Sequence, residues 1–409
     1  MLLFVITLII PIFDITSADY KSYKDYKVYE IEGDAQDIMG LVTSLSDDEA
    51  IPYYMNTNSS AEIIIAPDLE EDFSKAVHVY KLNKKMLIKD FSRIIKNEKP
   101  INRQNKLSFS WTAYYDVDDI YDYLKDMSKR YSKWTDLVVG GQSYEGRKIL
   151  GLRIKTPTAK VYKQIVFIES GIHAREWIAP ATTTYFINQL LTSTDPAITS
   201  LRDQFEWHIF PTVNPDGYHY SYTVERFWRK TRSKSSEKCY GSDPNRNWDY
   251  NWGKSGISTD PCDDIYPGIK PFSEVETRTL SEYILSLNIT AYIGFHSFGP
   301  VLLIPYSDSL DNISNYDDLV KIGKTSIEYG GIVNGTTYVG PVTSARHWYS
   351  ASGGSMDWVR YKLNTPLVFT YELRGEGFSW PPERIPEQGE EVTRMLIGLF
   401  IEACRLNYC

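Results

Sequence analysis

Apolar runs of strand length and segments with helical spacing alternate along the chain from residue 108 onward. The apolar runs lie at 150–154, 164–169, 205–211, 291–295 and 366–371. The helically spaced segments lie at 117–131, 177–191, 274–287 and 387–405. This alternation predicts an α/β domain with a mixed central sheet flanked by helices.

Two of the predicted helices carry start signals. Asp116 precedes the first and is suited to cap it. The third begins with Ser273-Glu274-Val275-Glu276, which has the spacing of a capping box. We therefore expect these two helices to begin at 117 and 274.

The first hundred residues predict a smaller unit. Strand-like segments lie at 26–31, 61–66 and 85–90, and helix-like segments lie at 34–45, 73–83 and 91–96. This order predicts a small open-sandwich α+β unit. The polar stretch that follows offers Arg103 and Lys106 to a trypsin-like protease, and a plain linker is the alternative.

The start of the chain and the overall charge limit the possible partners. An apolar run at 2–10 is broken by Pro11 and followed by Thr16-Ser17-Ala18, which is typical of a secretory signal peptide over 1–18. Later runs are too short to span a bilayer, so we expect no membrane span. The net charge of −9 over 409 residues argues against a nucleic-acid partner.

Four cysteines lie beyond the predicted signal peptide. They are Cys239, Cys262, Cys404 and Cys409. In an oxidising compartment they would pair, and spacing alone leaves three pairings open. No C-x-x-C pair is present, which disfavours a cysteine-based metal site.

Candidate chemistry lies where the predicted strands end. His173 and Glu176 follow the strand at 164–169, and an imidazole and a carboxylate at this spacing can share a zinc ion. His296 closes the strand at 291–295, and Glu372 closes the strand at 366–371. Carboxyl ends of strands meet at one edge of an α/β sheet, so these groups should converge. Taken singly, His296 could be a buried core histidine and Glu372 a surface carboxylate.

Further polar groups lie in the loops between these strands. Segments 226–230 and 244–248 each place arginines beside a tryptophan, an arrangement that packing of solvated arginines on aromatic rings also explains. The Ser352-Gly353-Gly354-Ser355 stretch indicates a tight turn close to Tyr349.

These motifs together resemble the secreted zinc metallocarboxypeptidases of the pancreatic A/B type, in proenzyme form. The matching segments, in family order, are H-A-R-E-W (173–177), F-W-R-K-T-R-S (227–233), N-R-N-W-D (245–249), H-S (296–297), Y-x-A-S-G-G-S-x-D-W (349–358) and Y-E-L-R (371–374). The resemblance covers about residues 108–405 closely and residues 19–106 by element order.

The resemblance implies one zinc ion per chain and a set of catalytic groups. His173, Glu176 and His296 would hold the zinc, and Asp243 would orient a zinc histidine. Glu372 would act as general base and proton shuttle. Arg229 would stabilise the oxyanion of the tetrahedral intermediate.

The resemblance also implies how a peptide's free C-terminus would be bound. Asn245, Arg246 and Tyr349 would bind the terminal carboxylate, for which a guanidinium is suited. Arg175 would contact the peptide further upstream. Met356 would line the pocket for the last side chain, and its apolar character favours aliphatic or aromatic residues.

Three other positions near these subsites modify the expectation. Ser307 and Ser344 map close to the pocket and make its walls more polar. Phe298 stands where relatives of this type usually carry a tyrosine in an upstream subsite.

The implied organisation is a signal peptide (1–18), an activation propeptide (19–106) and a zinc carboxypeptidase domain (107–409). The family disulfide falls on Cys239 and Cys262, and a bond between Cys404 and Cys409 is a plausible addition. We expect a secreted, extracellular monomer that acts on peptide or protein C-termini after activation by a trypsin-like protease. A catalytically silent zinc-binding or peptide-binding protein of the same fold, or an intracellular relative, is the alternative.

Overall fold

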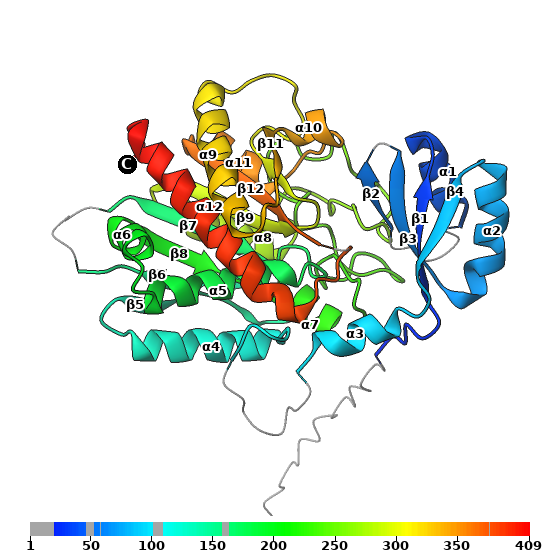
Figure 1. Cartoon of the computed structure of the whole chain (residues 1–409), viewed down its shortest axis with the longest axis horizontal. Coiled ribbons are helices and arrows are strands. Elements are labelled where there is room, and N and C mark those ends of the chain that lie inside the picture. Colours follow the sequence, from blue (N-terminus) through cyan, green and yellow to red (C-terminus); the bar gives the residue numbers. More distant parts are fainter. Residues whose placement is uncertain (1–19, 46–52, 58, 101–108, 158–162, 376) are drawn as a thin grey trace, which may run out of the picture.

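The computed structural model describes residues 20–409 except 46–52, 58, 101–108, 158–162 and 376. The predicted signal peptide and both candidate cleavage residues, Arg103 and Lys106, lie outside the described residues. Figure 1 shows a small N-terminal unit beside a larger domain. Across the described ranges, no helix combines the length and apolarity needed to cross a membrane.

The N-terminal unit is an antiparallel sheet covered by helices. Its strands are β1 (Lys27–Glu32), β2 (Tyr53–Thr57), β3 (Ser60–Ile65) and β4 (Asn83–Ile88), in the order β2-β3-β1-β4. Its helices are α1 (Ala35–Leu45), α2 (Glu70–Val79) and α3 (Ser92–Glu98). The predicted open sandwich is confirmed. The helix predicted at 73–83 instead spans Glu70–Val79, and it ends early because Asn83 already starts β4.

The two faces of this small sheet have different partners. Ile31 and Ile63 on one face pack against Phe73 of α2 in one cluster, together with residues of α1. Val28 and Ile64 belong to a second cluster that includes residues of the larger domain. The small sheet therefore lies between α1 and α2 on one side and α3 with the larger domain on the other (Figure 1).

The larger domain is built on a mixed sheet, as predicted. Its strand order is β11-β10-β12-β9-β7-β8-β6-β5, with β12, β9, β7 and β8 parallel to one another in the middle. The strands are β5 (Thr135–Gln142), β6 (Lys148–Ile154), β7 (Ile165–Ser170), β8 (Glu206–Phe210), β9 (Ile289–Ser297), β10 (Val301–Leu303), β11 (Val339–Val342) and β12 (Leu367–Leu373).

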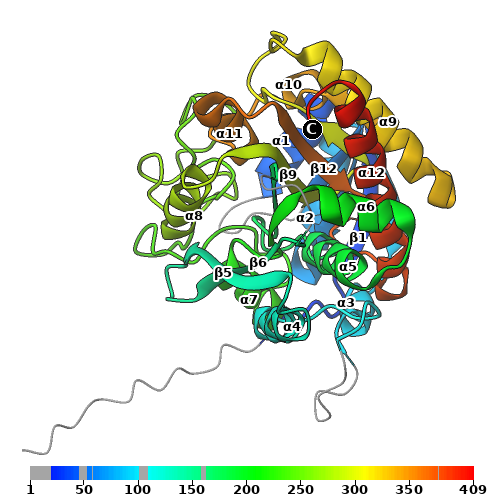
Figure 2. The same cartoon turned by 90° about the vertical axis from the view of Figure 1, so that its left-hand side faces the viewer.

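Helices cover both faces of this sheet. They are α4 (Val117–Arg130), α5 (Ile178–Thr192), α6 (Pro196–Gln204), α7 (Pro215–Thr223), α8 (Val275–Leu285), α9 (Tyr316–Asn334), α10 (Ser344–His347), α11 (Ser355–Leu363) and α12 (Ile385–Arg405). In Figure 2, α5, α6, α9 and α12 lie on one side of the strands, and α8 and α11 lie on the other.

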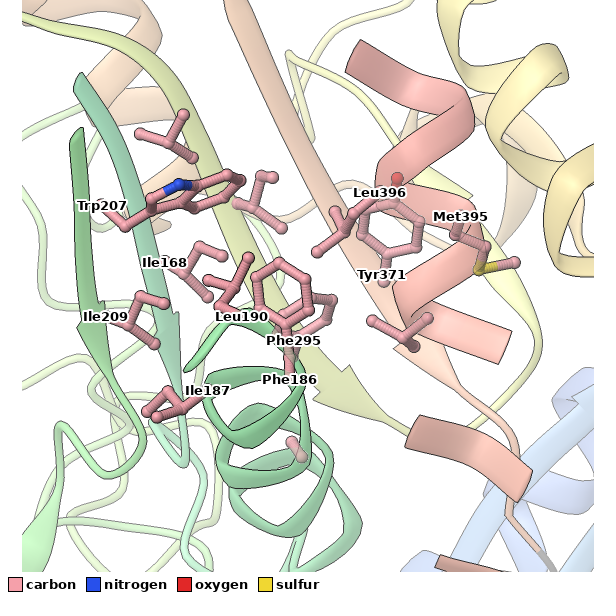
Figure 3. Packing of buried hydrophobic residues seen from close by; sticks show 14 of the residues in the cluster. Ile168, Phe186, Ile187, Leu190, Trp207, Ile209, Phe295, Tyr371, Met395 and Leu396 are labelled. Carbon is pink, nitrogen blue, oxygen red and sulfur yellow. The ribbon is translucent and has the colours of Figure 1, made fainter. Parts of the chain in front are cut away.

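The strand periodicity separates two cores. Ile168 and Phe295 face α5 and α12, where they pack with Leu190 and Leu396 (Figure 3). Residues of opposite parity, such as Phe167, belong to the cluster under α8 and α11. Because side chains alternate along a strand, the polar residues in phase with Phe167 lie on the α8/α11 face.

The two predicted helix starts had different outcomes. Asp116 is the N-cap of α4, and its carboxylate accepts a hydrogen bond from the backbone N–H of Val117 at 2.7 Å. The prediction of a capping box at the start of α8 is wrong, because the N-cap residue is Glu274 and its side chain makes no capping hydrogen bond. Glu276 instead accepts from the backbone N–H of Tyr144 at 2.9 Å.

Both disulfides are formed. Cys239 is bonded to Cys262, and Cys404 is bonded to Cys409. The first closes a loop between α7 and α8 that carries several of the polar groups described next. The second joins the end of α12 to the residues that follow it.

Candidate active site

The three strand-end groups converge at the carboxyl edge of the sheet, as predicted. β7, β9 and β12 are parallel neighbours, and His296 pairs in register with Glu372. His173 and Glu176 lie in the turn between β7 and α5, which begins at Gly171 with a φ of +65°. A residue with a side chain would be strained at this φ, so glycine permits the turn.

His173, Glu176 and His296 form a compact, buried set of metal ligands. One ligand atom from each lies within 4.8 Å of the others. His173 Nδ1 lies 2.7 Å from Glu176 Oε1 and 3.2 Å from His296 Nδ1. Two imidazole nitrogens facing each other beside a carboxylate fit a shared cation, and two histidines with one glutamate are a donor set that catalytic zinc uses.

The carboxylate of Asp243 connects this set to two arginines. Asp243 Oδ1 lies 3.2 Å from His173 Nε2, the nitrogen that faces away from the other ligands. Asp243 Oδ2 accepts from Arg229 at 2.8 Å and lies 3.9 Å from Arg246 NH1. Burial opposes ionisation of Asp243, but these guanidinium groups hold its pKa well below the usual range. Asp243 thus orients the His173 ring and the Arg229 guanidinium and lies close to Arg246.

The structure brings Arg246 close to Asn245 and Tyr349, the three residues expected to bind the substrate carboxylate. Its Nε and NH1 donate to the backbone carbonyls of Gly256 and Asn245 at 2.8 and 2.9 Å, and NH2 lies 3.5 Å from the Tyr349 hydroxyl. Asn245 Oδ1 accepts from the backbone N–H of Ser355 at 3.0 Å. Tyr349 is 55% exposed, whereas Arg246 is 4% exposed. The Arg246 guanidinium is therefore buried and held by backbone carbonyls, whereas the neighbouring Tyr349 side chain is accessible.

Arg175 contacts two residues that the sequence analysis did not single out. Its NH1 lies 2.8 Å from Asp264 Oδ2, and its guanidinium lies 4.3 Å from the centre of the Phe378 ring. Asp264 lies just after Cys262, which is bonded to Cys239. No local pattern marks Asp264 or Phe378, since both reach Arg175 only through tertiary packing.

Glu372 and Met356 lie on the α8/α11 side of the sheet. Glu372 is partly exposed, and burial raises the pKa of its carboxyl to about 7 against the opposing effect of His296. Met356 is buried in α11, and its Sδ lies 3.3 Å from Thr370 Oγ1. The Ser344 hydroxyl donates to the carbonyl of Tyr349, and the backbone N–H of Ser307 donates to Asp357.

An α/β domain with a buried two-histidine, one-glutamate set at the carboxyl edge of its sheet defines a zinc-dependent hydrolase. Sequence comparison then identifies the family, since the profile described as "Zinc carboxypeptidase" matches residues 120–395. The chain belongs to the zinc carboxypeptidases, of the A/B type, and is a zinc metallocarboxypeptidase.

Individual relatives support this membership. The chain is 37% identical to zinc carboxypeptidase A 1 of Anopheles gambiae, over 85% of this chain and 81% of that protein. It is 42% identical to a zinc carboxypeptidase of Simulium vittatum, over 72% of this chain and 98% of that protein. The crystal structure of carboxypeptidase A from Helicoverpa armigera matches with a TM-score of 0.83 at 25% identity, covering 95% of this chain and 100% of that one.

Proposed function

We propose that Arg246, Asn245 and Tyr349 bind the free carboxylate at the end of a peptide substrate. The observation that carries this proposal is the position of Asp243, which contacts both the zinc ligand His173 and the arginines at 229 and 246. A carboxylate bound at Arg246 would place the last peptide bond of the substrate beside the zinc site.

The remaining polar groups would carry out the hydrolysis. Zinc, when bound, polarises the substrate carbonyl and lowers the pKa of a nearby water. Glu372 takes the proton of the attacking water and passes it to the departing amine, for which a pKa near 7 is suitable. Arg229 directs Nε and NH2 to Asp243, and its NH1 lies 3.8 Å from Glu176. This nearness of NH1 to a zinc ligand supports the proposal that Arg229 stabilises the oxyanion.

Removal of the metal with a chelator, together with a change of the substrate's C-terminus, tests the proposed roles of zinc and of the carboxylate site. Trypsin-treated protein should hydrolyse a blocked dipeptide that ends in phenylalanine, lose this activity with a chelator, and regain it with zinc. The same dipeptide with an amidated C-terminus should be cleaved far more slowly. Binding of the free-acid peptide without turnover would instead support the catalytically silent alternative.

We propose an A-type preference for aliphatic or aromatic C-terminal residues. Met356 is apolar and only 5% exposed, so its side chain offers no counter-ion to a charged residue of the substrate. Similar proteins include both carboxypeptidases A and carboxypeptidases B, such as carboxypeptidase B of Astacus astacus at 38% identity. Met356→Asp should create cleavage of C-terminal lysine and arginine and weaken cleavage of phenylalanine. Faster cleavage of arginine than phenylalanine by the unaltered enzyme would contradict the preference.

We propose that residues 19–106 form an inhibitory propeptide and that residues 107–409 are the mature enzyme. The contact between the units includes a buried ion pair, with Arg226 Nε 2.7 Å from Glu98 Oε2 and both side chains 1% exposed. Phe91 of the N-terminal unit stacks on Phe227, with ring centres 5.3 Å apart. Phe227 is only two residues before Arg229, so one short loop segment contacts both the N-terminal unit and Asp243 of the zinc site.

The propeptide, the signal peptide and the monomeric state each have a direct test. Activity toward the blocked dipeptide should appear only after trypsin cleavage near Arg103 or Lys106, and equal activity before cleavage would contradict inhibition. Expression in a secreting cell should release the protein only when residues 1–18 are present. Light scattering of the trypsin-treated enzyme should give the mass of one chain.

A further inference from the structure

Three asparagines on the surface of the larger domain stand in the sequence pattern that accepts an N-linked sugar. This pattern is an asparagine, any residue except proline, and then a serine or threonine. The asparagines are Asn288, Asn312 and Asn334, and their hydroxyl partners are Thr290, Ser314 and Thr336. All three asparagines are exposed. A fourth instance, at Asn58, lies outside the described residues. Such tripeptides are common, so the surroundings of each asparagine decide whether the fold can carry a sugar there.

Asn288 lies far from the zinc site. It follows α8 and immediately precedes β9, so it is at the amino end of that strand. His296 lies eight residues further along the chain. At about 3.3 Å per residue, the two are separated by roughly 26 Å along the strand. A sugar on Asn288 would therefore project from the edge of the sheet opposite to the zinc site.

Asn334 has an amide group that can take a sugar and keep its present partners. It is the last residue of α9, and Gly335 after it has a left-handed conformation. The Asn334 amide oxygen accepts from the backbone N–H of Thr336 at 2.9 Å, and Nδ2 donates to Glu387 at 2.9 Å. An amide nitrogen carries two hydrogens, and attachment of a sugar replaces only one. Both interactions are therefore compatible with the modified side chain.

Asn312 also keeps its nitrogen available. It lies in the loop between β10 and α9, where its amide oxygen accepts from Arg346 at 2.7 Å. The next residue, Ile313, is buried and anchors the loop. Because the bond to Arg346 uses the oxygen, attachment of a sugar to Nδ2 does not compete with it.

Each of these asparagines lies within three residues of an exposed apolar side chain. These side chains are Leu285, Leu310 and Ile332, which are 47%, 64% and 77% exposed. Exposed leucine and isoleucine reduce the solubility of a protein, whereas a linked sugar is bulky and solubilising. The three positions therefore favour a solubilising group.

We propose that Asn288, Asn312 and Asn334 are N-glycosylation sites. The inference rests on the proposed function in one respect, because it requires that the chain be secreted. The oligosaccharide comes from a lipid-linked diphosphate donor of the secretory route. The bond between its anomeric carbon and the diphosphate oxygen breaks, that carbon forms a bond to Nδ2, and Nδ2 loses one proton. The lipid diphosphate is the leaving group.

The test locates the sugars on the full-length chain made in a eukaryotic secreting cell. Protein from the medium is treated with a peptide N-glycosidase in heavy-oxygen water, which leaves a labelled aspartate at each former site. Peptide mass spectrometry should find this label at 288, 312 and 334 in most copies, and the treated protein should migrate faster in a gel. Asn364 is exposed but is followed directly by its threonine, so it should stay unlabelled.

Matched variants separate the sequence pattern from the asparagine itself. Thr290→Ala and Thr336→Ala remove the pattern and should each abolish the label at one site, whereas Thr290→Ser and Thr336→Ser keep it. Asn312→Gln is used at the third site, because the Ser314 hydroxyl accepts from Arg360 at 3.1 Å. A variant that is not secreted is analysed in cell extracts, since the transfer precedes export.

The possible failures are distinguishable. Protein that reaches the medium without label overturns this inference and leaves the proposed secretion intact. Protein that stays in the cell and carries no label shows that the proposed secretion is wrong, and this inference falls with it. Label at 288 or 336-dependent label at 334 that survives the alanine variants would show that the sugar does not depend on the pattern, which also overturns the inference.

Discussion

Replacement of Arg246 tests the proposed carboxylate site most directly. Its guanidinium is 4% exposed and oriented by two hydrogen bonds to backbone carbonyls. Two parallel hydrogen bonds to a substrate carboxylate, each worth about 1.5–3 kcal/mol, would contribute about 3–6 kcal/mol. Arg246→Ala should therefore lower kcat/KM for a free-acid dipeptide by roughly 10²–10⁴-fold.

The assay compares the free-acid dipeptide with its C-terminal amide, which cannot use this interaction. Arg246→Ala should remove most of the preference for the free acid, whereas Arg246→Lys keeps the charge and should retain part of it. Zinc content and the melting temperature show whether the loop around Gly256 is intact. A well-folded, zinc-loaded Arg246→Ala enzyme that still prefers the free acid would refute the proposed role.

Three further predictions concern the base, the propeptide and stability. Glu372→Gln should lower kcat about 10²–10⁴-fold with zinc content and KM little changed, and a kcat within tenfold of normal would contradict its role. Glu98→Ala leaves Arg226 as a buried charge without this carboxylate, a loss of about 3–5 kcal/mol, so the uncleaved proenzyme should gain measurable activity toward small dipeptides. A hydrogen bond to Asp116 raises the pKa of His219, so His219 stabilises the fold fully below its ordinary pKa of about 6.5 and loses this effect as pH rises through the raised value. His219→Gln should therefore lower the melting temperature more at about pH 5.5 than at about pH 8.5, and an equal loss at both would contradict the ion pair.

The zinc ligands could be predicted because local sequence determines where they lie. His173 and His296 each follow or close an apolar run, and such runs are the buried parallel strands of an α/β sheet. The partners of Arg175 could not be predicted in this way. Asp264 and Phe378 come from distant segments, and their approach depends on how the loops pack on the finished sheet.

For two of the elements that the hydrophobic pattern missed, the physical reason is clear. Helix α9 contains Gly323 and Gly330, which weaken its helical pattern. At Gly330 a Cβ would lie 2.6 Å from Met395 Cγ of α12, so close helix packing requires the glycine. Strand β5 is at the sheet edge and alternates poorly, with Leu137 and Val139 exposed. In both cases tertiary position outweighs local preference.

The segment that carries Arg226, Phe227 and Arg229 contacts both the N-terminal unit and the zinc site. Its first two side chains are buried against Glu98 and Phe91 of the N-terminal unit, while Arg229 contacts Asp243 in the zinc site. Removal of the N-terminal unit would take Glu98 and Phe91 away and expose the side chains of Arg226 and Phe227 that they cover. Under the proposed activation, the same short segment would first bind the propeptide and would then, through Arg229, act on the substrate.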